Sequence, residues 1–454
     1  MSAAGPAEAV LRRGYRGRVP PARWSILVLG VWLGYLTALQ WSVVQYRLEI
    51  VLMLTASAVL LAAALVRRWR PGVLPHWQVA GSLVVCGFVA EAVPFFSYTS
   101  PLEHRWLAHG VAATCLLSAL AWANRGPAAS RVGFGVALAG LVATSAAAVI
   151  ADPAPRIDVW VILQQAADGT ARGQNVYQMT WVGSPGIKDA FTYLPWTAAL
   201  LAPGRWVAGD VRWALLVVFV IGLAALVALG ARRGAGTSSQ ALAAATLLAL
   251  APGTLTQAEQ AWTEPLLFAC LAAWALLVSR GRAWWAVVPL ALACASKQHM
   301  ALLLPVLACW PQFGLRRTVA TGGLAGLLIA PWFVASPSAF VHDTITLLVS
   351  FPPLRFADTL FIAARTELGW TPPFWLTGVI VLGVLTLACA MVRRRCPPLP
   401  ELLGWLALVL LVANLVNKQA FYNQYWLVAA LAALSLAATP GVSRPVDQSA
   451  AAAV

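Results

Sequence analysis

Long apolar runs make up most of the chain, and short segments rich in Arg, Pro, Gly and aromatic residues separate them. About 20 apolar residues are needed for a helix to cross a bilayer, and shorter helices are tolerated inside a bundle. The pattern predicts an all-α, polytopic transmembrane bundle with about 14 crossings. The predicted crossings are residues 24–44, 50–66, 77–92, 106–123, 132–151, 213–229, 241–251, 265–278, 283–296, 300–310, 318–334, 374–392, 402–415 and 425–438.

The longest polar interruption in the first half of the chain is the segment 152–210. Its residues 159–171 have helical periodicity, which predicts an amphipathic helix lying on the membrane surface. The apolar side of this helix is expected to carry Trp160, Leu163, Ala167 and Ala171, and the polar side Gln164, Gln165 and Asp168.

The same interruption ends with a second, shorter apolar stretch. It opens at Tyr193 and is expected to end at Pro203 and Gly204, which are poor helix formers. We expect a surface or re-entrant helix here, because a full crossing would move Arg232 and Arg233 to the opposite side from the earlier basic clusters.

Composition agrees with a membrane bundle. The chain is 60% hydrophobic and 10% charged, whereas in a soluble domain roughly a quarter of the residues are charged. A net charge of +15 raises the possibility of nucleic acid as a partner. The arginines instead follow the ends of the predicted crossings, so the expected partner is the lipid bilayer and not nucleic acid.

The basic clusters predict how the chain is oriented. If the N-terminus is cytoplasmic, one side of the membrane receives Arg67, Arg68, Arg70, Arg125, Arg131, Arg232, Arg233, Arg280, Arg282, Arg316, Arg317, Arg393, Arg394 and Arg395. Positively charged loops are retained in the cytoplasm. We therefore expect a protein of the cytoplasmic membrane, with a basic N-terminal segment, 1–23, and a disordered tail, 439–454, both in the cytoplasm.

Polar and aromatic residues recur on the opposite, extracytoplasmic side. They come from five segments, which are residues 152–210, 253–265, 296–299, 336–373 and 417–426. Together these segments supply an aspartate for general-base work, cations for a phosphate, and amide and aromatic side chains suited to sugars. The combination predicts a site that moves a sugar off a lipid phosphate.

Asp158 is the candidate catalytic base, although Asp is also a favoured N-cap where a surface helix begins. Lys297, at the tip of a short hairpin, is a candidate for binding the donor phosphate. The alternative for this lysine is that its side chain reaches to the membrane interface, which is common near helix ends.

Further candidates for donor or substrate contact are Arg156, Tyr177, Tyr193, His299, His342, Arg355, Lys418 and Tyr422. Several have structural alternatives. His342 with Asp343 is also compatible with a simple loop pair, and Arg355 with a salt bridge to Asp358. Lys418 and Tyr422 are also compatible with anchoring at the membrane interface.

A metal or cofactor is not indicated by a motif. Glu259 and Glu264 lack the paired spacing of a metal-binding carboxylate motif, and structural roles are preferred for them. Cysteines show no CxxC or CxxH spacing, so neither a disulfide framework nor a zinc site is expected. Departure of a lipid phosphate needs cationic stabilisation, and the sequence leaves open whether a divalent metal shares that work.

These segments resemble the GT-C superfamily of integral-membrane glycosyltransferases, and more closely the bacterial polyprenyl-phosphate-mannose-dependent mannosyltransferases. The matching motifs are Arg156-Ile-Asp158-Val-Trp160, Gly173-Gln-Asn-Val-Tyr177, Tyr193-Leu-Pro195, Leu201-Ala-Pro203, Lys297 at its hairpin tip, and Pro352-Pro-Leu-Arg355 with Asp358. Members use an aspartate of the first large extracytoplasmic loop as base, and Asp158 matches that position. The resemblance implies inverting transfer from a polyprenyl-phosphate sugar to a glycolipid or glycan acceptor of the cell envelope.

The resemblance covers residues 132–438, which it identifies as a catalytic module with 152–210 as its first large loop. Residues 24–131 form additional N-terminal helices, whereas the family usually has a single span before that loop. The sequence does not separate mannose from arabinose or glucose.

Two other functions are compatible with parts of the pattern. A transporter or lipid flippase would be expected to show internal repeats and ionisable residues at mid-membrane. No ionisable residue falls near the middle of a predicted crossing. A non-catalytic glycan-binding or scaffold protein would keep the aromatic outer loops but would tolerate loss of Asp158.

Overall fold

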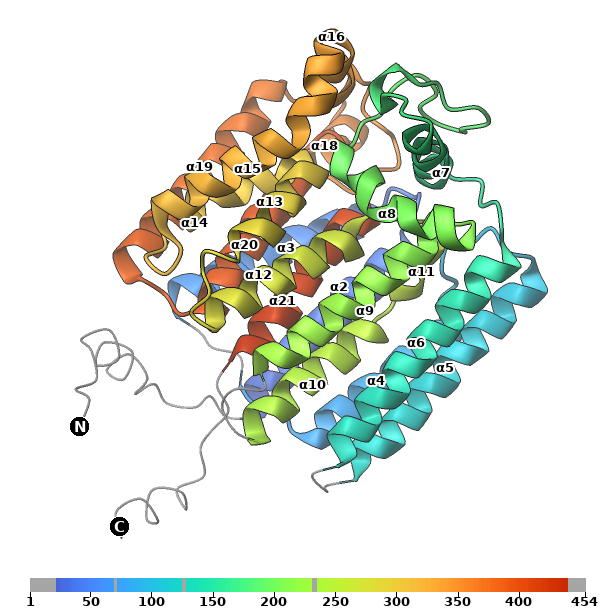
Figure 1. Cartoon of the computed structure of the whole chain (residues 1–454). Helices are drawn as coiled ribbons and strands as arrows, with labels where there is room; N and C mark the ends of the chain where they lie inside the picture. Colours follow the sequence, from blue (N-terminus) through green and yellow to red (C-terminus); the bar gives the residue numbers. More distant parts are fainter. Residues whose placement is uncertain (1–21, 69–71, 125–127, 231–234, 440–454) are drawn as a thin grey trace.

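The computed structural model describes residues 22–68, 72–124, 128–230 and 235–439, and throughout these ranges the regular structure is helical (Figure 1). The described residues thus form an all-α protein, as predicted. Most of the basic N-terminal segment, 1–21, and the tail from residue 440 lie outside the described residues.

A helix lies at each of the predicted crossings. These helices are α2 (Ala22–Trp41), α3 (Leu48–Val66), α4 (His76–Ala92), α5 (Pro101–Ala123), α6 (Ala129–Ala151), α9 (Val211–Gly230), α10 (Ala235–Ala249), α12 (Glu264–Ser279), α13 (Val287–Ser296), η2 with α14 (Gln298–Leu303 and Leu304–Ala308), α15 (Gly314–Ala335), α19 (Phe374–Arg395), α20 (Leu399–Val416) and α21 (Tyr422–Ala438). Seven of them, α3, α5, α6, α9, α15, α19 and α20, are long and apolar enough to span a bilayer. By length and composition the chain is a helical membrane protein, and the number of crossings stays a prediction.

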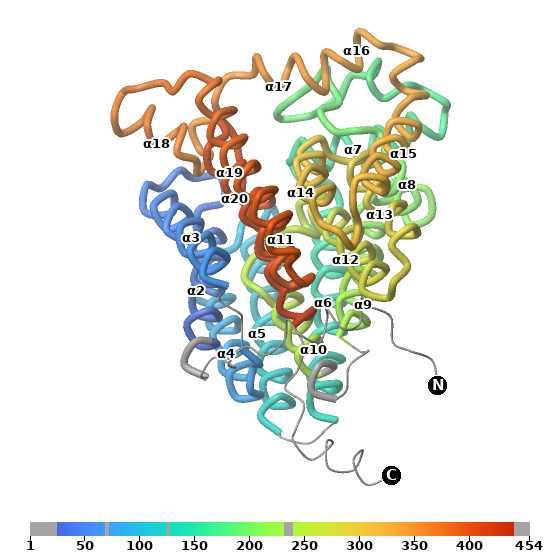
Figure 2. Tube along the Cα trace, turned by 90° about the vertical axis from the view of Figure 1, so that its left-hand side faces the viewer, coloured from blue at the N-terminus to red at the C-terminus, as the bar shows by residue number. Residues whose placement is uncertain are grey.

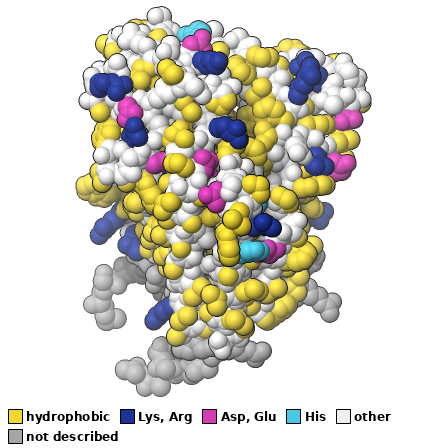
Figure 3. Space-filling model, turned by 90° about the vertical axis from the view of Figure 1, so that its right-hand side faces the viewer, with side chains coloured by type: hydrophobic (Ala, Val, Ile, Leu, Met, Phe, Trp, Pro, Cys, Tyr) yellow, Lys and Arg dark blue, Asp and Glu magenta, His cyan; other side chains and the backbone are white. Residues whose placement is uncertain are grey.

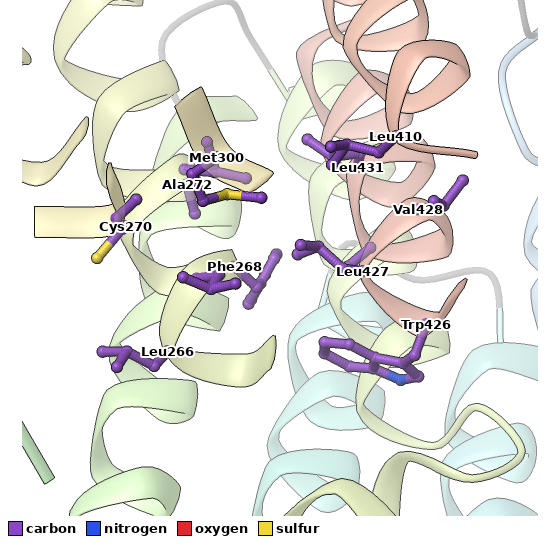
Figure 4. Packing of buried hydrophobic residues seen from close by; sticks show 14 of the residues in the cluster. Leu266, Phe268, Cys270, Ala272, Met300, Leu410, Trp426, Leu427, Val428 and Leu431 are labelled. Atoms are coloured by element: carbon purple, nitrogen blue, oxygen red, sulfur yellow. The ribbon is translucent and has the colours of Figure 1, made fainter. Parts of the chain in front are cut away.

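Helices α9, α12, α20 and α21 form the centre of the bundle. Phe268 of α12 packs edge-on against Phe219 and Trp426, with ring centroids 5.9 and 6.2 Å apart. Figure 4 shows Phe268 and Trp426 from close by, among the apolar side chains of α12 and α21. Gly222 allows α9 to approach closely, because a Cβ there would lie 2.8 Å from the Phe268 ring. Small residues at helix contacts are typical of membrane bundles.

The N-terminal helices are built into the same bundle. Helix α2 contacts α21, α3 contacts α20, and α4 and α6 contact α10; Figure 2 shows α2 and α3 running alongside the last helices of the chain. Trp32 donates to the Ala429 carbonyl at 3.1 Å and Tyr35 to the Tyr425 carbonyl at 3.0 Å. The described parts of residues 24–131 are therefore packed into one bundle with residues 132–438.

The two ends of the bundle differ in chemistry. Helices α7 (Asp158–Ala171), α8 (Pro195–Ala208), α16 (Pro337–Val341) and α18 (Leu360–Glu367) gather at one end (Figure 1), and the segment 336–373 crosses over it (Figure 2). Charged side chains collect towards that end on the face in Figure 3. The other end holds arginines, among them Arg395, which donates to the Leu65 carbonyl at 3.2 Å.

The helix after Tyr193 is longer than predicted. It runs through Pro203 and Gly204 and ends only at Ala208. The stop is Gly209, whose φ of 80° gives a left-handed C-cap that closes onto Gly204 and Arg205. Gly204 itself is a packing residue, because a Cβ there would lie 2.6 Å from the Ala214 nitrogen of α9.

Helix α7 lies where an amphipathic helix was predicted, and its place on the membrane surface stays a prediction; two of its residues lie differently from expectation. Leu163 and Ala167 are buried as expected, whereas Ala171 is exposed. Gln164, expected on the polar side, is buried because it accepts from the Val211 amide at 2.9 Å and donates to the Gly209 carbonyl at 3.1 Å. Its amide holds α7 against the junction of α8 and α9.

Candidate active site

Asp158 is the first residue of α7, at the polar end of the bundle. Its Oδ1 accepts the Val159 amide at 2.9 Å, so one carboxylate oxygen supports the start of the helix. The other, Oδ2, lies against Gly186, where an added Cβ would come within 2.7 Å. Burial raises the pKa of Asp158 above its ordinary value, and the amides of Val159 and Asp158 partly offset this.

A tyrosine and an arginine lie beside this carboxylate. Tyr98, in the loop between α4 and α5, has its pKa raised by burial and by the charge of Asp158. The Arg156 guanidinium lies 5.6 Å from the centre of the Tyr98 ring, and the Arg156 side chain is exposed. Tyr98 therefore lies near both the Asp158 carboxylate and an accessible cation. Sequence reasoning missed Tyr98 because its loop belongs to the helices that the resemblance does not cover.

Lys297 lies inside the bundle, directly after α13. Its Nζ forms an ion pair with Glu264 Oε1 at 2.5 Å and donates to Thr263 Oγ1 at 3.2 Å. Asn423 donates to the other oxygen of Glu264 at 2.8 Å. This buried group joins α12, α13 and α21. Asn423 was not a candidate from the sequence and Glu264 was given a structural role there, but nothing local to either residue indicates a partner so distant in the chain.

Tyr193 lies between Asp158 and Lys297. Lys297 Nζ is 5.6 Å from the Tyr193 ring centre, and burial, followed by the charges of Asp158 and Glu264, raises the pKa of the Tyr193 hydroxyl. The neighbouring Leu194 donates its amide to the Ser296 carbonyl at 3.1 Å. That bond holds the start of α8 against the end of α13, and it thereby brings the aspartate and the lysine to the same region.

Tyr177, His342 and Asp343 support the loop around Tyr193. The Tyr177 hydroxyl donates to the Tyr193 carbonyl at 2.9 Å. Asp343 accepts the Phe191 amide at 2.7 Å and contacts the His342 ring nitrogen at 2.9 Å. Tyr177 is buried and His342 is exposed, so of these residues only His342 is accessible at the surface.

A groove of about 500 Å³ opens between the loop 180–189 and the segment 347–351. Its lining residues are Thr180, Trp181, Val182, Gly186, Ile187, Lys188, Asp189, Leu347 and Phe351. Gly186 therefore has the groove on one side and the Asp158 carboxylate on the other. Lys418 holds the segment 347–351, which forms the wall opposite the loop 180–189. Its Nζ donates to the carbonyls of Val349 and Phe351 at 2.6 and 2.5 Å.

The remaining candidates do not join Asp158. Arg355 is exposed, and within the described ranges it forms no salt bridge with Asp358, which instead accepts the Arg47 amide at 3.0 Å. The Tyr422 hydroxyl is buried and donates to the Pro252 carbonyl at 2.9 Å. His299 is half-buried and follows Lys297 closely in the chain.

Comparison with known proteins adds no further assignment. No protein-family model matches the chain, and no curated protein matches it. In the described part of the chain, no three His, Cys, Asp or Glu side chains are close enough together to hold a metal ion. The case for a function therefore rests on the chemistry around Asp158.

Proposed function

We propose that the protein is an inverting membrane glycosyltransferase with Asp158 as its base. It moves a hexose, mannose being the first candidate, from a polyprenyl-phosphate donor to a glycolipid or polysaccharide acceptor of the cell envelope, on the extracytoplasmic face. The observation that carries the proposal is a largely desolvated aspartate at the polar end of an apolar bundle, beside Tyr98, whose ring also contacts the exposed cation Arg156.

The proposed reaction needs a base and a stabilised leaving group. Asp158 takes the proton of an acceptor hydroxyl, whose oxygen forms a bond to the anomeric carbon while the bond from that carbon to the phosphate oxygen breaks. A raised pKa makes a carboxylate a stronger base for this step. Arg156 stabilises the departing phosphate, and Lys297 does so where the phosphate competes with Glu264 for its ammonium group.

The distribution of polar groups favours this proposal over a transporter or flippase. Such proteins carry ionisable groups at mid-membrane. Here the ion pair of Lys297, the Asp158 carboxylate and the groove beside Gly186 all belong to segments at one end of the bundle. A site at one membrane face suits an enzyme whose donor is held by a lipid.

The proposal is tested by sugar transfer in membranes. Radiolabelled polyprenyl-phosphate mannose, glucose and arabinose are offered with envelope lipids to the wild type, to Asp158→Asn and to Glu49→Gln, an exposed carboxylate at the same end. We expect one donor to support transfer by the wild type and Glu49→Gln. Asp158→Asn should lose about 10²- to 10⁴-fold, the usual contribution of a general base.

Two results contradict the proposal. Equal transfer by the wild type and a folded Asp158→Asn protein removes Asp158 from the mechanism. Absence of transfer from all three donors, with the protein folded in the membrane, removes the enzyme assignment.

A further inference from the structure

Helix α11 (Thr254–Glu259) carries a polar side that is turned into the protein. At about 3.6 residues per turn, Thr256, Gln257, Glu259 and the following Gln260 share one continuous side of the helix. We call these four residues the α11 polar face. Each of them is at most 1% exposed, which is unusual for a set that includes two primary amides and a carboxyl group.

Most of the polar atoms on this face lack a partner. Within the described ranges, no residue hydrogen bonds to either amide atom of Gln257 or Gln260, to Thr256 Oγ1 or to Glu259 Oε2. The other oxygen of Glu259 accepts from the Ser97 hydroxyl, and the Tyr98 amide also interacts with this carboxyl group. Buried polar groups are almost always paired in native proteins, because leaving them unpaired destabilises the fold. The unpaired atoms of the α11 polar face are therefore candidates for binding a ligand.

The backbone at both ends of α11 is left-handed. Gly253 precedes the helix with φ of 76°, and Ala261 follows it with φ of 56°. Alanine rarely takes this conformation, since its Cβ approaches the following carbonyl. Gly253 takes this conformation without strain, whereas Ala261 is strained, and strained residues are concentrated at ligand clamps and switch regions.

The α11 polar face adjoins both halves of the candidate active site. Glu259 contacts Ser97, next to Tyr98 and the Asp158 carboxylate. On the other side of the turn, α12 begins at Glu264, the partner of Lys297. A group bound by α11 would therefore lie close to the proposed reaction centre.

The chemistry of the unpaired atoms selects the ligand. Gln257 and Gln260 each offer an N–H donor group and a carbonyl acceptor, and Glu259 adds a carboxyl oxygen. A phosphate offers only acceptors, so it would leave the oxygens of the two amides and of Glu259 unpaired. A cation would leave the amide N–H donors unpaired. Hydroxyl groups donate and accept, so they match the whole set.

We infer that the α11 polar face recognises the hydroxyl groups of the transferred sugar. This inference rests on the proposed glycosyltransferase function and adds to it the residues that bind the glycosyl unit, as distinct from the lipid phosphate.

The test measures binding, which does not require transfer. Purified full-length protein in lipid nanodiscs is titrated with polyprenyl phosphate and with polyprenyl phosphate carrying mannose, glucose or arabinose. Gln257→Met and Gln260→Met remove the amides at similar volume. Gln240→Met is the matched control, because Gln240 is equally buried but fully paired, with the Leu74 amide at 2.9 Å and the Gly72 carbonyl at 3.3 Å.

We expect the wild type to bind one sugar-bearing lipid more tightly than polyprenyl phosphate. Gln257→Met and Gln260→Met should each lower this preference about five- to tenfold, the effect of one or two hydrogen bonds, with the affinity for polyprenyl phosphate unchanged. Gln240→Met should keep the preference and lower the Tm.

Either of two results overturns the inference. One is a wild type that does not distinguish the sugar-bearing lipids from polyprenyl phosphate. The other is an unchanged preference in both glutamine variants together with a raised Tm, which would mean that the amides are only unpaired core groups or hold water. Because no transfer is needed, a failed Asp158→Asn test leaves this result standing, and a failed binding test leaves the transfer assay standing.

Discussion

The position of the Asp158 carboxylate depends on a residue with no side chain. Gly186 leaves the space that Oδ2 occupies, while the Val159 amide holds Oδ1. The two contacts fix the rotation of the carboxyl group, and a general base must meet its proton donor within hydrogen-bonding distance. The rate of sugar transfer should therefore be sensitive to a single methyl group added at residue 186.

Gly186→Ala should reduce transfer about tenfold or more while the protein stays folded. The new methyl group would lie 2.7 Å from Oδ2, so the carboxylate must rotate away, and small misplacements of catalytic groups cost up to about 10²-fold in rate. The measurement is kcat/KM for transfer together with the Tm. Gly135→Ala, where the Cβ meets open space, is the control; equal rates in all three proteins would contradict the placement.

Lys297 and Glu264 allow a structural role to be separated from a chemical one. Lys297→Met leaves the Glu264 carboxyl buried without its partner, and loss of one member of a buried ion pair costs about 3–5 kcal/mol. The double variant Lys297→Met/Glu264→Gln should recover most of this stability, measured by thermal unfolding in detergent.

Transfer by the same double variant identifies what Lys297 does. If Lys297 binds the donor phosphate, the stable double variant should still lack transfer. Recovery of transfer together with stability would show that the lysine acts only through its ion pair.

At the scale of an element, α11 links stability to pH. Burial raises the pKa of Glu259 from 4.5 to about 7. The unfolded chain releases this proton near pH 4.5, whereas the folded protein holds it until about pH 7. Between these values the folded state binds more protons, so stability falls as pH rises and then levels off above pH 7.

Glu259→Gln should therefore gain Tm relative to the wild type as pH rises from 5 to 8. The variant keeps a polar side chain and cannot ionise, so the loss linked to ionisation disappears. The measurement is the difference in Tm between the two proteins across this range. A difference that stays constant with pH would show that the Glu259 carboxyl group is not buried as described.

At the scale of the whole molecule, the bundle has a polar end and an arginine-rich end. At the second end the Arg395 side chain donates to the Val66 carbonyl at 3.0 Å, and Arg317 lies 5.4 Å from the Trp284 ring centre. The positive-inside rule predicts that this end faces the cytoplasm.

Thiol labelling tests this orientation. Cys396 is exposed at the arginine-rich end and Val182 is exposed at the polar end. In intact cells a membrane-impermeant maleimide should label Cys396→Ser/Val182→Cys and spare the wild type, and in inverted vesicles the labelling should reverse. The opposite result would place the Asp158 end in the cytoplasm and remove an extracytoplasmic transfer site.

Local patterns in the sequence determined much of this protein. Apolar runs and their flanking arginines located the helices, and a 3.6-residue periodicity located α7, because both features depend only on neighbours in the chain. The polar segment 152–210 likewise fills the interval between the end of α6 and the start of α9. The segment 336–373 fills the interval between the end of α15 and the start of α19.

Only the tertiary structure decided which polar groups meet. It paired Lys297 with Glu264, put Tyr98 beside Asp158, buried Gln164 and carried α8 through Pro203. These outcomes depend on the packing of helices that are distant in sequence, where an amide or carboxyl group takes whichever partner the bundle brings within about 3 Å. Composition and periodicity carry no information about such pairs.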